Sequence, residues 1–265
     1  MTQCGNDRAG GVGLKRVRVA VLSVAGLVFG VLHVVAAPAT HVVVIGCDGM
    51  SPDGIAHAKT PHMDRMMAKG ASTMHARAVM PTSSSPNWAS MIMGAGPEQH
   101  GVTSNDWRVN KFETAATVTL ESGFFPTIFA LIDAQMPEAV TASIYDWGGF
   151  GNLFAHDDVD IVDDTAGLEK TTARAEAVMR ESKPLFTFVH LDHVDHVGHD
   201  KGHGTPEYYA SVEEADTYIG RILAAIEAAG IADSTAVIVT SDHGGRGKGH
   251  GGNSMGEIEI PWIVT

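Results

Sequence analysis

Three short apolar runs in this chain each lead directly into aspartate and histidine residues. They are HVVVIG at 41–46, residues 184–191, and TAVIVT at 235–240. Their length and β-branched content are typical of buried strands in a parallel sheet. Helical patterns alternate with them, the longest at 206–229. This alternation predicts an α/β fold: a three-layer α/β/α sandwich with a mostly parallel central sheet. Further strands are expected at 72–79, 140–145 and 261–265, and further helices at 61–69, 125–135 and 169–181.

Polar side chains follow each of the three apolar runs. Because the carboxyl ends of parallel strands lie at one edge of a sheet, we expect these side chains to converge there. A glycine-rich loop at 244–252 can bring one more histidine to the same place. Three carboxylates and three imidazoles suit two divalent cations, zinc first, with manganese or magnesium as alternatives. The residues concerned are Asp48, Asp195, His199, Asp242, His243 and His250.

The segment at 81–87 (PTSSSPN) supplies hydroxyl groups just before an expected helix. A hydroxyl beside a bound cation has a lowered pKa and becomes a nucleophile. The amino end of the helix would favour phosphate oxygens, and Asn87 could donate a hydrogen bond to one of them. From the residues alone, Thr82 and the serines at 83–85 are all candidates for the nucleophile.

Five segments together resemble the nucleotide pyrophosphatase/phosphodiesterase branch of the alkaline phosphatase superfamily. They occur in that family's order at 44–49, 81–87, 94–101, 195–199 and 241–244. The resemblance implies that Ser84 is the nucleophile and also contacts a metal ion. Three positions depart from the family pattern. Ser84 stands where the family usually has threonine, Ser85 replaces the aromatic residue that follows it, and Trp88 stands where the family often has histidine.

The same resemblance implies how the ligands divide between two metal ions. Asp195, His199 and His250 would hold one ion. Asp48, Asp242 and His243 would hold the other.

These features predict a metal-dependent hydrolase of phosphodiester or pyrophosphate bonds that acts through a phosphoserine intermediate. A broad-specificity alkaline phosphomonoesterase is the first alternative, with Arg108 or Arg246 as the nearest cationic side chains. A sulfatase-like hydrolase is the second, although Trp88 stands where a sulfatase motif needs arginine. A non-catalytic metal-binding fragment is the alternative from another class. Asp192, His193, His196 and His203 are expected to surround the site, and Trp107 or Trp147 could line a substrate pocket.

Charge and the two ends of the chain limit the remaining choices. The net charge of −13 argues against a nucleic-acid-binding surface, so a small phosphoester is the expected partner. A basic cluster at 15–18, an apolar run at 19–37 and an A-P-A exit make residues 1–39 a signal peptide, or alternatively a membrane anchor. We therefore expect a periplasmic or secreted catalytic domain at 40–265, with a possible cap at 104–160. The resembling proteins continue beyond Thr265, which suggests a truncated carboxyl end.

Overall fold

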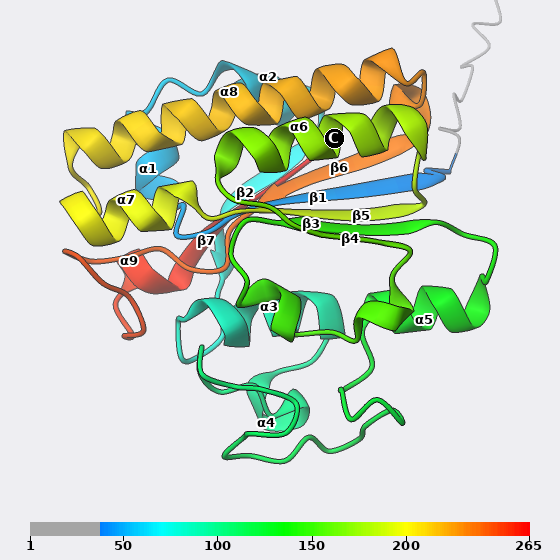
Figure 1. Ribbon diagram of the computed structural model, residues 1–265. Coiled ribbons are helices and arrows are strands. Elements are labelled where there is room, and N and C mark those ends of the chain that lie inside the picture. Colours follow the sequence, from blue (N-terminus) through cyan, green and yellow to red (C-terminus); the bar gives the residue numbers. More distant parts are fainter. Residues whose placement is uncertain (1–37) are drawn as a thin grey trace, which may run out of the picture. The chain divides into compact units, whose positions relative to one another are not determined.

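The computed structural model describes residues 38–265, which form helices on both faces of one central sheet (Figure 1). The sheet has seven strands in the order β2-β7-β6-β1-β5-β3-β4. Neighbouring strands pair in parallel, except that β7 runs antiparallel to both β6 and β2. This is the expected α/β sandwich with a mostly parallel sheet. The strands are β1 (His41–Cys47), β2 (Ala71–Arg77), β3 (Thr141–Tyr145), β4 (Ile161–Asp164), β5 (Phe186–Leu191), β6 (Thr235–Thr240) and β7 (Glu259–Val264).

The helices divide between the two faces of the sheet. Helices α1, α2, α6 and α7 pack with the long helix α8 on one face, and α3 contacts α4 and α5 on the other (Figure 1). Their bounds are α1 (Pro52–His57), α2 (Pro61–Lys69), α3 (Ser84–Met93), α4 (Pro97–His100), α5 (Ile128–Gln135), α6 (Leu168–Glu181), α7 (His193–Lys201), α8 (Pro206–Ala228) and α9 (Met255–Ile258).

Most expected elements are present, with bounds shifted by a few residues at most. Strand β6 and the bounds of α2 coincide with the predicted ranges, and α8 ends one residue earlier than expected. The expected last strand is present but antiparallel, a direction that its composition does not reveal. Several elements were not predicted. They are the short helices α1, α4 and α9, strand β4, which is half aspartate, and helix α7, whose sequence HVDHVGHDK has no clear apolar stripe.

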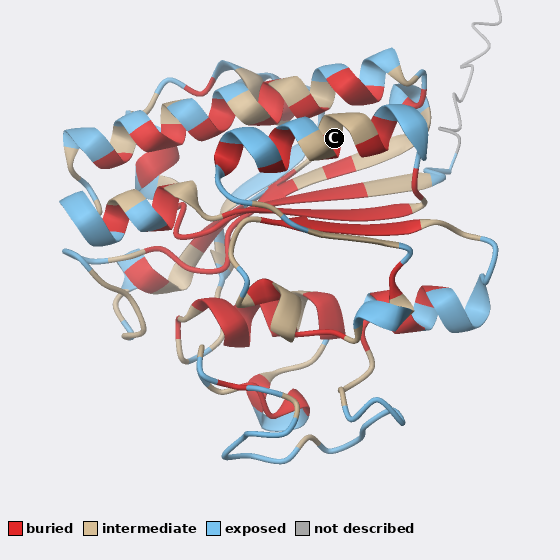
Figure 2. Cartoon of the chain, in the orientation of Figure 1, coloured by how far each residue is buried: buried red, intermediate tan, exposed pale blue. Residues whose placement is uncertain are grey.

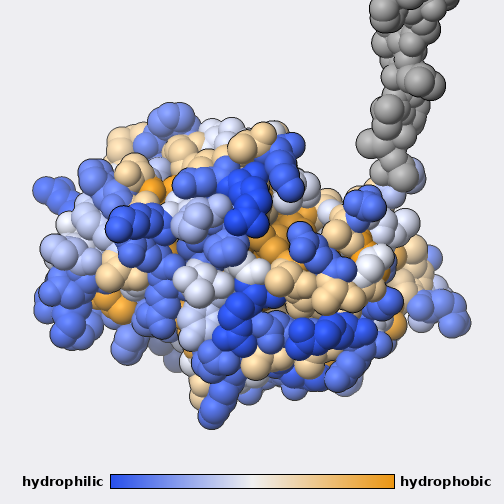
Figure 3. Space-filling model, turned by 90° about the horizontal axis from the view of Figure 1, so that it is seen from above, coloured by the Kyte–Doolittle hydropathy of each residue, from blue (hydrophilic) through white to orange (hydrophobic). Residues whose placement is uncertain are grey.

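Two hydrophobic clusters hold the layers together, one on each face of the sheet. The first joins β1, β5 and β6 to the inner sides of α2, α6 and α8. The second is aromatic and lies between the sheet and α3, around Trp88, Phe150 and Phe188. Strands β1, β3 and β5 are buried along most of their length, as parallel strands covered on both faces must be (Figure 2). Seen from the side of α8, the outer surface is predominantly hydrophilic (Figure 3).

Two expected regions are the possible cap at 104–160 and the targeting segment at 1–39. The range 104–160, expected as a possible cap, contributes α5 and the sheet strand β3. The long stretch without a helix or sheet strand is 101–127, which begins three residues before that range and ends at α5. The expected targeting segment, 1–39, falls outside the described residues except at its last two positions. Among residues 38–265, no helix is long and apolar enough to span a bilayer.

Gly46, in β1, lets helix α3 approach the sheet. A Cβ added there would lie 2.6 Å from the Trp88 ring and 3.2 Å from Phe188. We predict that Gly46→Ala lowers the free energy of unfolding by ~1–3 kcal/mol, because overpacking forces the buried ring to shift. Urea denaturation would measure the change.

The matched control is Gly249→Ala, because an added Cβ at Gly249 meets no atom within 4 Å. Its stability should change by less than ~0.5 kcal/mol. Equal stability of the Gly46→Ala variant and the wild type would show that α3 does not depend on this close approach.

Candidate active site

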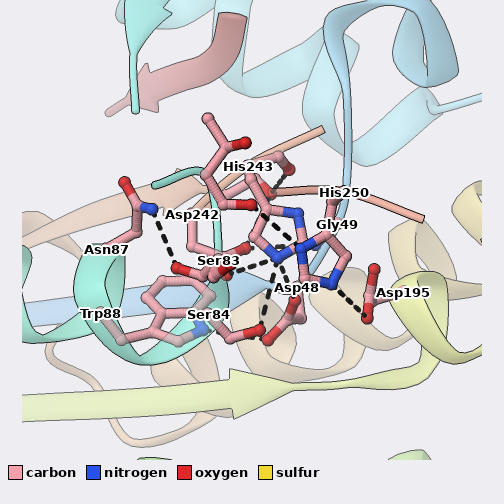
Figure 4. Close-up of polar contacts among 12 residues, drawn as sticks. Asp48, Gly49, Ser83, Ser84, Asn87, Trp88, Asp195, Asp242, His243 and His250 are labelled. Atoms are coloured by element: carbon pink, nitrogen blue, oxygen red, sulfur yellow. Dashed lines mark hydrogen bonds and ion pairs between the residues drawn. The ribbon is translucent and has the colours of Figure 1, made fainter. Parts of the chain in front are cut away.

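The six predicted Asp and His side chains lie together at the carboxyl edge of three adjacent strands. Strands β6, β1 and β5 are neighbours in the sheet, so the residues that follow them meet there. The ligand atoms of the six residues fall into two compact groups, each with its atoms within 4.8 Å of one another (Figure 4). One group is Asp195, His199 and His250, and the other is Asp48, Asp242 and His243.

The first group is built from a helix and a loop. Asp195 and His199 are four residues apart on α7, so both project from the same side of that helix. The His199 Nε2 atom lies 3.1 Å from Asp195 Oδ2. His250 comes from the glycine-rich loop before α9, and its Nε2 atom lies 3.2 Å from His199 Nε2 and 3.8 Å from Asp195 Oδ2.

The second group is fully enclosed by protein and lies against Ser84. The His243 Nε2 atom is 3.1 Å from Asp242 Oδ2 and 3.4 Å from Asp48 Oδ1. The Ser84 Oγ atom is 3.4 Å from the same His243 nitrogen. Ser84 is the first residue of α3, so its hydroxyl lies at the amino end of that helix (Figure 4). The two groups adjoin, because the rings of His243 and His250 stack with centroids 3.8 Å apart.

Backbone carbonyls orient all three candidate histidine ligands in the same way. The Nδ1 atoms of His199, His243 and His250 lie 2.8–3.0 Å from carbonyl oxygens of Lys248, Gly244 and Thr82, respectively. Because a carbonyl oxygen can only accept, each Nδ1 must carry the proton. The Nε2 atom of each ring then faces the carboxylates, which is the arrangement of histidines that bind metals.

The carboxylates of both groups are short of positive charge. Asp48 Oδ1, Asp195 Oδ1 and Asp242 Oδ2 are buried and have no hydrogen-bond partner in the part of the chain that the structure describes. Burial and the charges of neighbouring aspartates raise the pKa of Asp195 to about 9 and that of Asp242 well above its ordinary value. Burial lowers the pKa of His243 to about 4, so its ring is neutral. Carboxylates and neutral imidazoles in this arrangement fit divalent cations.

Asp48 has different surroundings from the other two carboxylates. Burial alone would raise its pKa, but the hydrogen bond from His190, the nearby imidazoles and the Trp88 indole lower that pKa to about 2. Asp48 is therefore ionised at neutral pH. The His190 ring lies between two carboxylates, which outweigh the effect of burial and raise its pKa to about 9.

The segment that carries Ser84 is tied to the loop that carries His250. The Thr82 hydroxyl donates to the Gly252 carbonyl at 2.7 Å and accepts the Gly251 N–H at 3.1 Å. Thr82 also supplies the carbonyl that orients His250. The segment that carries Ser84 and one candidate metal ligand therefore hold each other in place.

Asn87 is engaged within its own loop. Its side-chain nitrogen donates to the carbonyls of Val79, Pro81 and Ser83, and its Oδ1 accepts the Val79 N–H at 2.7 Å. The side chain is 2% exposed. In this arrangement no amide proton of Asn87 is left for a phosphate oxygen, so the structure lends no support to the expected donor role.

Asn105 is a site residue that sequence reasoning missed. Its Oδ1 accepts the Ser85 N–H at 2.8 Å, which turns its amide nitrogen away from that backbone. The nitrogen makes no hydrogen bond to another described residue, and the side chain is partly exposed. No local pattern marks this position, because its approach to α3 depends on the path of the 101–107 loop.

The other residues singled out in the sequence surround the site or lie outside it. The His203 ring is buried with its Nε2 atom 3.7 Å from Asp195 Oδ1. Asp192 lies beside Asp48, and its backbone N–H donates to Asp146. His193 pairs with Glu214 at the surface. The exposed or outlying positions are His196, Arg108 and Arg246, whereas Trp107 is buried and Trp147 is half-buried near His190.

The chain is similar in sequence to a family of known enzymes. Residues 42–247 match the model of the type I phosphodiesterase / nucleotide pyrophosphatase family. The chain belongs to this family. A curated relative is the bis(5'-adenosyl)-triphosphatase enpp4 of Mus musculus, 25% identical over 222 residues, which cover 78% of this chain and 47% of that protein. The chain spans less than half the length of the curated relatives that it matches.

Solved structures show the same fold. Murine ectonucleotide pyrophosphatase/phosphodiesterase 5, as an inactive form in complex with AMP, superposes with a TM-score of 0.64 at 22% identity and covers 77% of this chain and 57% of that one. A 2-O GAG sulfatase superposes with a TM-score of 0.67 at 14% identity, covering 86% and 64%. These similarities identify the alkaline-phosphatase-like fold that phosphodiesterases and sulfatases share.

The raised carboxyl pKa values predict how cation binding depends on pH. Burial raises the pKa of Asp195 to about 9 and that of Asp242 well above its ordinary value, which favours their protonated forms, so a cation must displace protons as it binds. We predict that Mn²⁺ affinity rises as the pH is increased from about 6 towards the raised pKa of Asp195, by up to ~10-fold per unit for each proton displaced. Isothermal titration calorimetry in two buffers would measure both the affinity and the protons released.

The matched variant for this experiment is Asp195→Asn, which removes one displaceable proton along with one candidate ligand. Its pH slope should be lower than that of the wild type by ~1. A wild-type affinity that stays constant with pH would contradict the protonation states described above.

Proposed function

We propose that this chain is a metal-dependent hydrolase of phosphoesters that acts on phosphodiester or pyrophosphate bonds. One observation carries the proposal. Three histidines, each with its Nδ1 bonded to a carbonyl, turn their Nε2 atoms towards buried aspartates that each keep one oxygen without a hydrogen-bond partner among the described residues, and one of these histidines, His243, lies 3.4 Å from the Ser84 hydroxyl. Family membership supports the same reaction class.

In this proposal Asp195, His199 and His250 hold one ion. Asp48, Asp242 and His243 hold the second, and Ser84 contacts it. Nitrogen and oxygen ligands of this kind favour zinc, with manganese or magnesium as alternatives. When bound, two such ions neutralise charge on the phosphoryl oxygens and lower the pKa of the serine hydroxyl.

Ser84 is proposed as the nucleophile. Its Oγ attacks phosphorus, the bond to the leaving alcohol or phosphate breaks, and a phosphoserine forms. Water then cleaves the phosphoserine and regenerates the hydroxyl. The adjacent His243 nitrogen carries no proton, so it does not compete for the hydroxyl oxygen as a hydrogen-bond donor.

Two features of the chain would bind the phosphoryl oxygens. The amino end of α3 favours an anion, because the first N–H groups of a helix point outward. The free amide of Asn105 lies next to the same turn and is the better candidate for a side-chain donor. Asn87, in contrast, shapes the loop that presents Ser84.

Several observations favour diesters over other esters. The two candidate arginines, Arg108 and Arg246, are exposed, and no arginine belongs to the serine motif. One relative is named a bis(5'-adenosyl)-triphosphatase, a name that implies a small phosphoanhydride substrate. A sulfatase-type motif would need arginine at position 88, where this chain has a tryptophan that donates to Asp48.

The proposal includes a location for the enzyme. Residues 1–39 would act as an export signal, or alternatively as a membrane anchor, and residues 40–265 would form the catalytic domain in the periplasm or outside the cell. The exposed stretch at 101–127 would lie at the substrate side of α3.

Replacing Ser84 tests the nucleophile. We predict that Ser84→Ala lowers kcat for bis-p-nitrophenyl phosphate by at least ~10³-fold, because no other hydroxyl reaches the same position. The Asp and His ligands remain, so the variant should still bind metal. Ser83→Ala is the matched control and should keep activity within ~3-fold of the wild type. Full activity of the Ser84→Ala variant would contradict the assigned nucleophile.

A substrate panel tests the reaction class. With zinc, manganese or magnesium present, bis-p-nitrophenyl phosphate should give a higher kcat/KM than p-nitrophenyl phosphate, since no arginine clamps a dianionic phosphoryl group. p-Nitrophenyl sulfate should not be hydrolysed above background. A preference for the monoester would favour a phosphatase, and turnover of the sulfate ester would overturn the proposal.

A further inference from the structure

One oxygen of Asp48 is held by two side chains from different elements. Asp48 Oδ2 accepts a hydrogen bond from Trp88 Nε1 at 3.0 Å and lies 3.0 Å from His190 Nε2. Its other oxygen, Oδ1, has no hydrogen-bond partner among the described residues and faces His243 Nε2 at 3.4 Å. The two oxygens of one carboxylate therefore have different surroundings, one occupied by donors and one left open.

Trp88 links this carboxylate to the nucleophile. It lies on α3 four residues after Ser84, so both side chains project from the same side of that helix. Its ring is fully buried and packs edge-on against His190 and Phe188, at centroid distances of 5.1 and 5.7 Å. In Figure 4 the indole nitrogen of Trp88 points towards Asp48 and lies near Ser84. The indole N–H therefore fixes the distance between α3 and the end of β1.

His190 links the same carboxylate to the next strands. Its second nitrogen, Nδ1, lies 3.6 Å from Asp146 Oδ1, and that oxygen accepts the Asp192 N–H at 2.8 Å. Because a carboxylate can only accept, the Nε2 atom carries a proton that it donates to Asp48, whereas the Nδ1 atom makes no hydrogen bond to another described residue. The ring thereby spans the ends of β1, β5 and β3 and is 0% exposed.

We propose that Trp88 and His190 are positioning residues that fix the orientation of the Asp48 carboxylate. They hold its Oδ2 atom by hydrogen bonds, so that its Oδ1 atom faces the cation beside Ser84. The role of the cation rests on the proposed function. The geometry itself does not, since it consists of contacts within the chain. Hydrogen bonds to a ligand carboxylate fix its orientation and typically change metal affinity by ~10–100-fold when they are lost.

Trp88→Phe is the test, because it keeps an aromatic ring in the core and removes the N–H. In wild-type protein, a competition titration with a chromophoric zinc chelator should resolve two bound equivalents. Trp88→Phe should weaken one equivalent by ~10–100-fold and leave the other within ~2-fold. In steady-state assays with subsaturating zinc, kcat should fall while KM for the phosphodiester stays within ~3-fold.

Phe150→Leu is the matched control for packing. Phe150 contacts Trp88 and His190 through its ring but makes no hydrogen bond to Asp48. Its stability should fall in urea denaturation, while both zinc equivalents keep their affinities. A second pair of variants, at His190, tests the same role without relying on the Trp88→Phe variant to fold. His190→Gln keeps a donor and should retain most of the affinity, whereas His190→Leu should lose it.

The outcomes separate this inference from the proposed function. Two zinc equivalents bound with wild-type affinity by both Trp88→Phe and His190→Leu would overturn the positioning role while leaving the hydrolase proposal intact. Selective weakening of one equivalent in a protein that hydrolyses no phosphoester would support the positioning role and refute the function. A wild-type chain that binds no zinc would overturn both.

Discussion

The arrangement of the site depends on the burial of three aspartates side by side. Burial, together with the charges of neighbouring aspartates, raises the pKa values of Asp195 and Asp242, and each of these two and Asp48 has an oxygen without a hydrogen-bond partner among the described residues. Burying such groups without compensation is costly, and cations are the usual compensation. The chain keeps these groups together because adjacent parallel strands end at one edge, where the backbone of each strand is already paired.

Hydrogen bonds from the surrounding protein fix the orientation of these candidate ligands. Backbone carbonyls fix the histidine tautomers, Thr82 ties the serine segment to the His250 loop, and Trp88 with His190 holds Asp48. Each of these contacts joins elements that are far apart in the sequence. The site is therefore rigid through contacts around it, while the ligand side chains themselves carry few hydrogen bonds to one another.

Local pattern was enough to predict every strand except β4, and to predict that the six candidate Asp and His side chains meet at one edge of the sheet. HVVVIG and TAVIVT are β-branched and are followed by aspartate, so both the strand and the polar side chain at its end could be predicted. Helix α7 was missed because more than half of its residues are His or Asp, although the four-residue spacing of Asp195 and His199 was noticed. The antiparallel direction of β7 was not predictable, since a single strand has no preferred direction by composition.

The roles of the two asparagines and of Trp88 could not be predicted from the sequence, because they depend on tertiary contacts. Asn87 stands beside Ser84 in sequence, yet its amide bonds three carbonyls of its own loop, whereas Asn105 reaches Ser85 from a separate loop. Trp88 was noted only as a departure from the family pattern, and nothing local indicates that its indole N–H meets Asp48.

The most direct test of the central claim is an anomalous difference map from crystals of the zinc-loaded protein. The account predicts two peaks ~3.5–4 Å apart. One should lie among Asp195, His199 and His250, and the other among Asp48, Asp242 and His243, within bonding reach of the Ser84 hydroxyl. A single peak, or zinc bound elsewhere with these six side chains unoccupied, would contradict it.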